Sequence, residues 1–456
     1  MLSAESRQGR SAADSRPVRS PTWWRLRGAK FALLATALLP GLLIYIALRA
    51  RSRRPLVGIW QKLTGRIAPL TATDDRPTVL VHGVSLGETA LMRPLVPRIE
   101  AELGVHCLLS TTTETGWVGL EKGFPEHRRV FLPFDLPWAV ERFLTLAKPR
   151  AVILLEAEFW PVLISACGRR GIPVVLVNAR LSPSSFALFR PLRRLVAPLF
   201  ASYAAAGAQN GLYAARLRVL GCRDAVPCGS LKADMVRLAT PEQIDVEGTR
   251  TGLVRGEPVL LLASTSAGEE ATVLAAWFNS PRTWRIVICP RHPERGAELV
   301  ELCARHGLTA VRSSAGGKLA GPGALIVDEI GRLGAQYGWC ARENGIAVVG
   351  GGLGSGRGGQ NMLEAAAAQC ATVVGWDVRA QPDSMHLLRA SGGVAEVTPE
   401  SIAATLAHLA GVAEERQALG TGGHRAWLAG QGASKRVLAQ IFGALRGLGR
   451  GRGTVD

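Results

Sequence analysis

The chain has 456 residues, and a usual domain size of about 150 residues predicts two or three domains. Hydrophobic residues make up 47% and charged residues 20%, which indicates a globular rather than a disordered protein. The formal charge of +18, from 54 Lys and Arg against 36 Asp and Glu, favours an anionic partner: nucleic acid, an acidic membrane surface or a phosphorylated substrate.

The N-terminal region has the composition of a tail followed by a membrane anchor. Residues 1–30 are polar and rich in Arg, and we expect them to be disordered. Residues 31–48 (FALLATALLPGLLIYIAL) carry no charge and approach the length that spans a bilayer, so we prefer an uncleaved anchor to a cleaved signal peptide. The basic residues that follow predict a cytoplasmic catalytic region, although Arg25, Arg27 and Lys30 weaken this inference.

From residue 77 onward, short apolar runs alternate with segments of helical periodicity, which is typical of parallel sheets covered by helices. We expect strands at 78–82, 105–110, 150–155, 173–177 and 201–207, and a second series at 258–263, 284–289, 323–327, 345–350 and 371–375. The pattern predicts an N-terminal Rossmann-like domain over 67–235, a linker over 236–257, and a C-terminal Rossmann-like domain over 258–447 that includes closing helices. A cleft between the two domains is expected.

Metal chemistry has no support in the sequence. The eight cysteines are scattered, without a C-x-x-C pair or zinc-ligand spacing, and we expect them to be reduced and buried. No D-x-D follows a strand to hold a metal-bound nucleotide sugar. We therefore expect neither a metal nor a cofactor.

The stretch HGVSLGE (82–88) follows the first strand and precedes a helix. Ser85 and Glu88 have the spacing of a capping box, in which each side chain binds a free N–H of the helix start. The alternative is a carboxylate displayed at the carboxyl end of a strand, where open α/β sheets bind ligands. These residues alone do not separate the two interpretations.

Two further stretches of the first series carry charge. EAEFWP (156–161) places Glu156 and Glu158 directly after a strand among apolar residues, which favours a polar site because isolated buried acids are costly. GSLKAD (229–234) places Lys232 near the expected domain junction, where it is either a solvated linker residue or faces the cleft.

In the second series, Arg291 and His292 follow a strand, and a guanidinium there could bind a phosphate through paired N–H groups. The glycine-rich stretch at 350–359 leads to a helix expected to start near Gln360, with Glu364 in its first turn. Ser266 and Glu269, in ASTSAGEE (263–270), fit helix capping.

In order, HGVSLGE, LPFDLPWAVERFL, EAEFWP, VVLVNARLS, GSLKAD, ASTSAGEE, PRHPER and RGGQNMLEAAA resemble the Kdo (3-deoxy-D-manno-octulosonic acid) transferases of lipopolysaccharide assembly. These are GT-B glycosyltransferases, with two Rossmann-like domains facing across a cleft, anchored at the cytoplasmic face of the inner membrane. The resemblance implies CMP-Kdo as donor, a lipid A precursor as acceptor, an anionic membrane surface as partner, and no nucleic acid.

The resemblance also implies roles for individual residues. Glu88 would be the general base, and Glu158 and Lys232 would stabilise the transition state. The donor would be bound by residues from three segments: Arg291 and His292; Ile330, Gly331 and Arg332; and Asn361, Met362, Leu363 and Glu364.

The sequence departs from the family's usual pattern at several of these segments. Ala157, Ser266, Ser230 and Gln360 replace usual residues, and so do Met362 and Ala365. At Arg332 a base replaces the usual acid. These departures concern nucleotide contacts more than the class of reaction.

Three other interpretations are open. The first is another membrane-bound GT-B transferase with a different donor or lipid acceptor. The second is a nucleic-acid-binding protein, favoured by the charge but lacking a recognition motif. The third is an NAD-dependent enzyme, because Gly354, Gly356 and Gly359 spell G-x-G-x-x-G within a stretch where glycine abounds.

Overall fold

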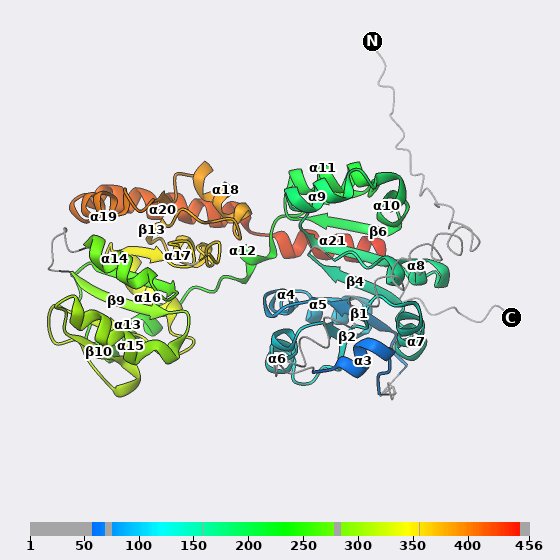
Figure 1. Ribbon diagram of the computed structural model, residues 1–456, viewed down its shortest axis with the longest axis horizontal. Coiled ribbons are helices and arrows are strands. Elements are labelled where there is room, and N and C mark those ends of the chain that lie inside the picture. Colours follow the sequence, from blue (N-terminus) through cyan, green and yellow to red (C-terminus); the bar gives the residue numbers. More distant parts are fainter. Residues whose placement is uncertain (1–56, 69–74, 157, 278–283, 355, 447–456) are drawn as a thin grey trace, which may run out of the picture. The chain divides into compact units, whose positions relative to one another are not determined.

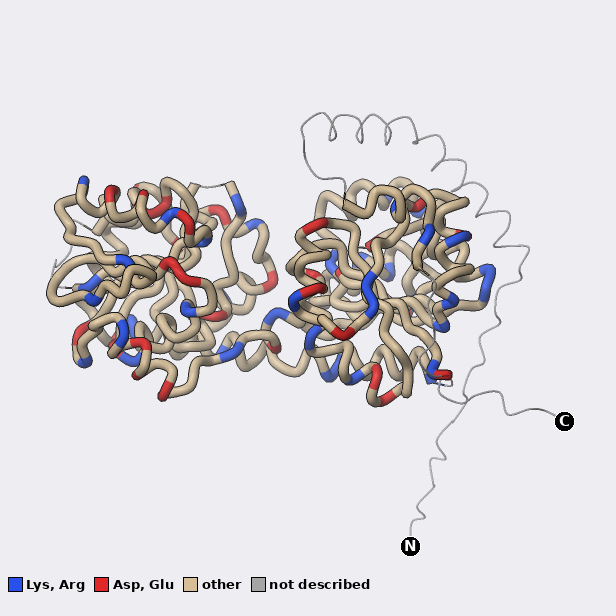
Figure 2. The backbone as a smooth tube through the Cα atoms, turned by 90° about the horizontal axis from the view of Figure 1, so that it is seen from below, with Lys and Arg blue, Asp and Glu red and all other residues tan. Residues whose placement is uncertain are grey.

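The computed structural model describes residues 57–68, 75–156, 158–277, 284–354 and 356–446. These residues form two compact units (Figure 1). Unit 1 combines the chain up to Val226 with the segment from Val437 onward, and unit 2 is Pro227–Arg436. Lys and Arg residues are distributed over both units (Figure 2).

Unit 1 is built on a seven-stranded sheet with the order β3-β2-β1-β4-β5-β6-β7. Its strands are β1 (Thr78–His82), β2 (His106–Thr111), β3 (Arg129–Phe131), β4 (Ala151–Leu155), β5 (Val174–Ala179), β6 (Tyr203–Ala208) and β7 (Ala225–Pro227). Its helices are α3 (Ile59–Thr64), α4 (Leu86–Leu91), α5 (Val96–Leu103), α6 (Glu114–Gly123), α7 (Pro137–Ala147), α8 (Pro161–Arg170), α9 (Pro183–Phe189), α10 (Arg193–Phe200), α11 (Gly211–Leu220) and most of α21 (Ala433–Ala444).

Unit 2 has a second seven-stranded sheet, with the order β10-β11-β9-β8-β12-β13-β14. Its strands are β8 (Val259–Thr265), β9 (Arg285–Pro290), β10 (Ala310–Arg312), β11 (Ala324–Ile326), β12 (Ile346–Val349), β13 (Ala371–Val374) and β14 (Ala395–Glu396). Its α-helices are α12 (Leu231–Met235), α13 (Pro241–Thr251), α14 (Glu269–Trp277), α15 (Gly296–Arg305), α16 (Leu333–Arg342), α17 (Leu363–Ala367), α18 (Pro382–Ala390), α19 (Ile402–Gly411) and α20 (Ala413–Gly430).

Both sheets are buried between helices, which explains the continuous apolar runs. In β8, Leu260 and Leu262 belong to one core cluster, while Leu261 and Ala263 belong to a second. Successive strand residues point to opposite faces, so the two clusters are the two covered faces of the sheet. The expectation of two parallel α/β domains is confirmed.

All ten expected strands are present, with ends that differ from the expected ones by at most two residues. The four unexpected strands β3, β7, β10 and β14 have only two or three residues each, too few to form an apolar pattern. Each sheet has its switch of strand order beside its first strand, between β1 and β4 in unit 1 and between β8 and β12 in unit 2. Ligands of open α/β sheets bind at the carboxyl ends of such strands.

The segment expected as a linker differs from that expectation. Residues 241–251 form α13, which starts with a capping box between Thr240 and Gln243. The helix buries Glu247, Gly248 and Thr251, and because these are not apolar, the sequence shows no hydrophobic period. The chain passes between the units at Val226 and again at Val437, so the last helix, expected to close the second domain, returns largely to unit 1.

The expected tail (1–30) and membrane anchor (31–48) lie outside the described residues. Within the described ranges, no helix has the length and apolar character needed to cross a membrane. The same ranges hold no group of three His, Cys, Asp or Glu residues arranged to bind a metal ion. All eight cysteines are buried and free.

Candidate functional site

Glu88 lies in the first turn of α4, directly beyond the carboxyl end of β1. Its carboxylate accepts a hydrogen bond from the Val84 N–H at 2.6 Å and another from the Ser85 hydroxyl at 3.1 Å. Ser85 is the N-cap residue, but its hydroxyl accepts no helix N–H. Of the two interpretations, the capping box is therefore not formed, because the carboxylate reaches back to Val84 and accepts a hydrogen bond from the Ser85 hydroxyl.

Two more acids follow the neighbouring strand β4. Glu156 has a left-handed backbone with φ 64°, and Asn178 donates to its carboxylate at 3.4 Å. The carboxylate of Glu158 accepts a hydrogen bond from the Trp160 indole N–H, and its carbonyl accepts one from the Tyr203 hydroxyl at 3.1 Å. The switch of strand order thus gathers the carboxylates of β1 and β4 at one sheet edge.

This gathering changes the acidity of two of the carboxyl groups. Burial raises the pKa of Glu88 to about 7, and the charge of Glu156 adds to the rise, while the hydrogen bonds from Val84 and Ser85 oppose it. Burial likewise raises the pKa of Glu158 to about 7, with the charge of Glu88 as the next cause. The Glu88 carboxyl is therefore less acidic than an ordinary glutamate, although it lies at the start of a helix. A carboxylate with a pKa near the working pH is well suited to be a general base.

His82 extends this cluster, although no sequence pattern singled out this residue. Its side chain is fully buried at the end of β1, and burial lowers its pKa to about 3, so the imidazole is neutral. Nδ1 lies 2.9 Å from the Ser110 hydroxyl, while Nε2 lies 3.8 Å from a carboxylate oxygen of Glu158. The imidazole therefore faces Glu158 as a neutral polar group.

In unit 2, the glycine-rich stretch at 350–354 and 356–359 follows β12, and its first residues are held by the start of α14. The carboxylate of Glu269 accepts hydrogen bonds from the N–H groups of Ser266, Gly351 and Leu353, each at 2.8 Å. At Gly350 an added Cβ would lie 2.6 Å from the Cα of Thr265, so only glycine allows this approach. The loop is thus a preformed backbone surface at the switch point of the second sheet.

The loop leads into the expected nucleotide-contacting residues. Helix α17 begins at Leu363 rather than near Gln360, and Asn361 donates to the Glu364 carboxylate at 2.8 Å. Burial raises the pKa of Glu364, and the Asn361 hydrogen bond and the positive charge of Arg291 oppose the rise. Met362 and Leu363 are buried core residues, so their side chains hold α17 in place.

Two other expected donor segments lie in the same unit. Arg291 is exposed and directly follows β9. Its backbone N–H donates to the Thr265 carbonyl at 2.9 Å. His292 lies beside it, with Nδ1 3.3 Å from the Glu294 carboxylate. Because Arg291 acts on the pKa of Glu364, β9 and α17 contribute to one charged region.

Lys232 also belongs to unit 2. Its ammonium lies 3.5 Å from the side-chain oxygen of Gln381. The N–H of the preceding Ala380 donates to the carbonyl of Gly358 at 2.9 Å. The 376–381 segment therefore connects Lys232 to the glycine-rich loop.

Arg332, expected to contact the donor, is engaged by two carboxylates of unit 2. Its side chain is buried, and its guanidinium pairs with both carboxylate oxygens of Glu247 and with Glu329. Its partner Glu247 comes from α13, the helix in the expected linker. These pairs engage all three guanidinium nitrogens, so Arg332 ties α13 to the start of α16. Ile330 is 91% exposed and Gly331 has φ 90°, so this turn is open to contact.

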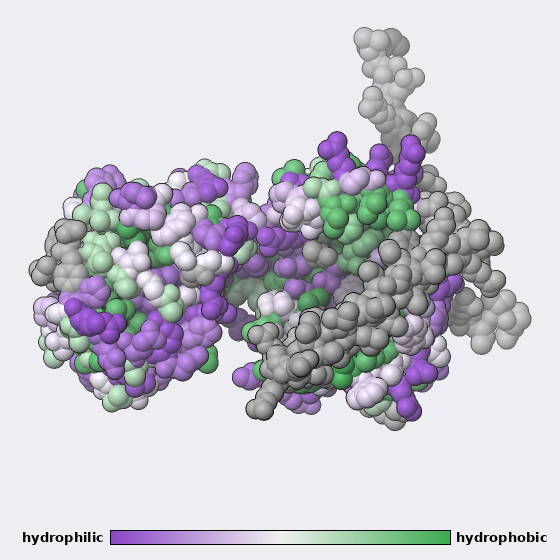
Figure 3. Space-filling view, in the orientation of Figure 1, coloured by the Kyte–Doolittle hydropathy of each residue, from purple (hydrophilic) through white to green (hydrophobic). Residues whose placement is uncertain are grey.

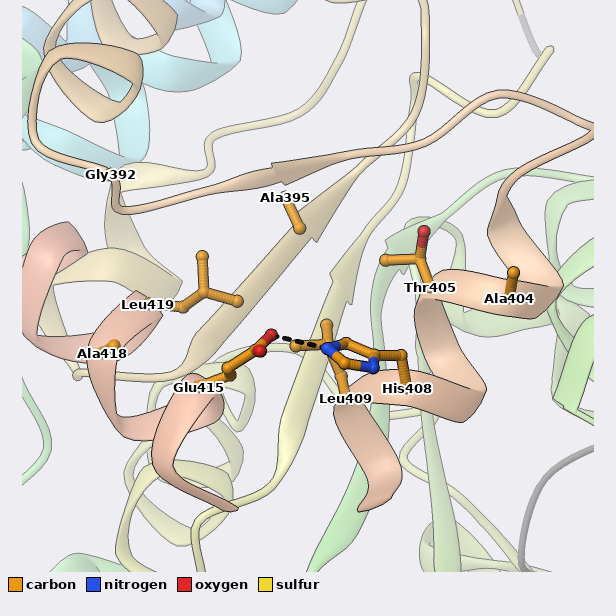
Figure 4. A pocket seen from close by; sticks show the side chains of 9 residues that line it. All are labelled: Gly392, Ala395, Ala404, Thr405, His408, Leu409, Glu415, Ala418 and Leu419. Carbon is orange, nitrogen blue, oxygen red and sulfur yellow. Dashed lines mark hydrogen bonds and ion pairs between the residues drawn. The ribbon is translucent and has the colours of Figure 1, made fainter. Parts of the chain in front are cut away.

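A hollow of about 560 Å³ lies elsewhere in unit 2, between β14, α19 and α20 (Figure 4). It is lined mainly by small apolar side chains, and His408 pairs with Glu415 across it at 2.8 Å. None of the expected site residues lines it. The hollow is therefore separate from the expected site residues.

Comparison with known proteins gives consistent results. Residues 59–235 match the family model described as 3-deoxy-D-manno-octulosonic-acid transferase (kdotransferase). The 3-deoxy-D-manno-octulosonic acid transferase of Bordetella pertussis is 35% identical over 73% of this chain and 80% of its own length. The enzyme of the same name from Haemophilus influenzae is 28% identical over 79% of this chain and 85% of its own length.

A solved structure supports the fold alone. A glycosyltransferase from Rickettsia africae matches 82% of this chain and 100% of its own, with a TM-score of 0.55 and 11% identity. The two parallel-sheet α/β units resemble those of GT-B glycosyltransferases. Taken with its relatives, the chain belongs to the 3-deoxy-D-manno-octulosonic acid transferase family and is a glycosyltransferase that adds Kdo in lipopolysaccharide biosynthesis.

Proposed function

We propose that the enzyme transfers Kdo from CMP-Kdo to a hydroxyl of a tetra-acylated, bisphosphorylated lipid A precursor, with inversion at the anomeric carbon. Glu88 is the general base. It accepts the proton of the acceptor hydroxyl as the oxygen attacks the anomeric carbon, while the bond to CMP breaks and CMP leaves with the electron pair. The observation that carries this role is the Glu88 carboxyl, held at the end of β1 with a pKa of about 7.

Glu158 supports this base. Burial raises the pKa of Glu158, and the charge of Glu88 adds to the rise. A proton on Glu158 lets Glu88 carry the negative charge that a base needs. Trp160 and His82 fix the position of Glu158 from the side of β1 and β4.

The donor is bound by unit 2. Arg291 supplies charge for the phosphate, His292 lies next to it, and Asn361 and Glu364 supply polar groups for the ribose or base. The glycine-rich loop allows backbone N–H groups to come close to the phosphate of the donor. Lys232 offsets the charge that develops on the departing phosphate.

The enzyme acts at the inner membrane, with both units on the cytoplasmic side. The uncharged stretch at 31–48 serves as the anchor, and the net charge of +18 favours the anionic lipid surface. Fractionation of cells that express the full chain, with and without high-salt extraction, tests this location. Release of the protein by salt alone would contradict an apolar anchor.

The reaction is tested by mass spectrometry of the detergent-solubilised full chain, supplied with freshly generated CMP-Kdo and the tetra-acylated precursor. We expect the acceptor to gain the mass of one or more Kdo residues, and the mass ladder counts the sugars. CMP release without a heavier acceptor would contradict the choice of acceptor. Transfer from another nucleotide sugar, but not from CMP-Kdo, would contradict the donor.

A further inference from the structure

Helices α9 and α10 of unit 1 expose an unusual number of large apolar side chains. Leu188, Leu192 and Leu195 are 64%, 47% and 38% exposed. Helix α9 contains no fully buried residue at all. Hydrophobic side chains gather over this part of unit 1, with hydrophilic side chains along their margin (Figure 3). We call residues 183–200 the α9–α10 surface.

The charge of this region has a single sign. Residues 180–223 contain no Asp or Glu, and their arginines are at positions 180, 190, 193, 194, 216, 218 and 223. Arg190, Arg193 and Arg194 are exposed within the α9–α10 surface. Among the residues that the structure describes, no ion pair or side-chain hydrogen bond engages these three guanidinium groups. Apolar side chains beside unpaired cations fit a surface with acyl chains and anionic headgroups.

The α9–α10 surface is joined to the carboxylate cluster by packed aromatic rings. Phe159, the residue after Glu158, stacks on Phe200 of α10 with ring centroids 4.9 Å apart. It also meets Phe189 of α9 edge-on, at 5.1 Å. A molecule or surface that binds to α9 and α10 therefore lies next to the loop that carries Glu158.

We propose that the α9–α10 surface docks on anionic membrane lipid, with Leu188, Leu192 and Leu195 entering the acyl-chain boundary and the three arginines contacting phosphate headgroups. Docking at this place brings an acceptor embedded in the bilayer to the carboxylate edge of unit 1. The inference rests on the proposed function only for the identity of that acceptor. The lipid contact itself is independent of catalysis.

The test uses the full chain with Leu192→Cys, labelled with an environment-sensitive fluorophore. Selective labelling is feasible because the eight native cysteines are buried. The protein is reconstituted in nanodiscs of phosphatidylcholine alone or with phosphatidylglycerol. We expect a blue-shifted emission, quenched by spin-labelled acyl chains, that is stronger in the anionic discs. Val246→Cys is the matched control, because Val246 is 66% exposed on α13 of unit 2, and its emission should not change.

A second variant separates charge from apolar insertion. Replacing Arg190, Arg193 and Arg194 by Glu in the labelled protein should weaken the preference for anionic discs by on the order of fivefold per arginine. Unchanged emission at position 192 in both kinds of disc would overturn the proposal, and so would an equal shift in both kinds. Because the readout needs no substrate, lipid contact without Kdo transfer would reject the proposed function and leave this inference standing.

Discussion

Two glutamates occupy equivalent places in the two units but differ in their hydrogen-bond partners and surroundings. Ser85–Glu88 follows β1 and Ser266–Glu269 follows β8, each with Ser-x-x-Glu spacing and each beside the switch of strand order. Glu269 is 1% exposed and accepts three backbone N–H groups. Glu88 accepts one backbone N–H and one hydroxyl, and lies among other acids.

The neighbouring strand explains the difference. Beside β8, the N–H groups of the glycine-rich loop after β12 donate to the Glu269 carboxylate. The carboxylate is therefore used to hold that loop. Beside β1, the turn after β4 carries Glu156 and Glu158. Burial raises the pKa of Glu88 and of Glu158 to about 7, and the charge of Glu156 adds to the rise at both. The same motif can therefore fix a binding loop or supply a base, and the adjacent strand decides which.

The largest expected effect is on Glu88. Glu88→Gln should lower the rate of Kdo transfer by about 10²–10⁴-fold, because the amide cannot accept the proton of the acceptor hydroxyl. The rate is measured by mass spectrometry, and the melting temperature should not fall. Glu114→Gln is the control, since Glu114 also lies in a first helical turn at this sheet edge, in α6. Equal losses in the two variants would contradict a special role for Glu88.

The second-largest expected effect concerns Glu269, the glutamate of unit 2. Glu269→Gln should destabilise unit 2 by about 1–3 kcal/mol for each N–H left without a full acceptor. We also expect a higher KM for CMP-Kdo, because the glycine-rich loop loses its attachment to the start of α14. Thermal unfolding and donor titration measure the two effects. Glu298→Gln, a change at an exposed carboxylate that accepts no backbone N–H from the glycine-rich loop, should do neither.

A moderate effect is expected on the pH profile. Transfer should rise with pH through about 7, because the base must be ionised. Glu156→Gln should shift this limb to lower pH, since removal of a neighbouring negative charge lowers the pKa of Glu88. The limb is followed by the rate at subsaturating substrate. A limb that stays in place would show that Glu156 has no electrostatic effect on the base.

The smallest effect concerns stability. The folded-state pKa of Glu88 is above its ordinary value, so its contribution to stability is present below about pH 4.5 and is lost as the pH rises through about 7. Glu88→Gln removes this loss. The variant should therefore gain stability relative to the unmodified protein between pH 5 and pH 8, measured by urea unfolding. A constant difference across this range would argue against a raised pKa.

The fold was largely predictable, because strands buried on both faces leave continuous apolar runs such as PVLLLA before α14. The helix α13 was missed, since its buried positions hold Glu247, Gly248 and Thr251 rather than apolar residues. The position of Glu88 at a strand end was also readable from spacing alone. Its acidity was not, because that depends on burial and on Glu156, which is distant in sequence.

Arg332 and His82 show the same limit. The change from acid to base at Arg332 suggested altered donor contact, yet its partner Glu247 lies 85 positions away in the chain. His82 has no distinctive sequence neighbour, and only the pairing of β1 with β2 and β4 brings it to Ser110 and Glu158. Residue pairs that depend on the register between strands cannot be predicted from local sequence patterns.

The most direct measurement is the turnover of Glu88→Gln and Glu269→Gln in one assay, at saturating CMP-Kdo and at a temperature where both variants are folded. The account predicts that Glu88→Gln loses turnover by orders of magnitude, while Glu269→Gln approaches the rate of the unmodified protein once the donor is saturating. Full turnover by Glu88→Gln, or equal losses in both variants, would contradict the division of the two glutamates into a base and a loop anchor.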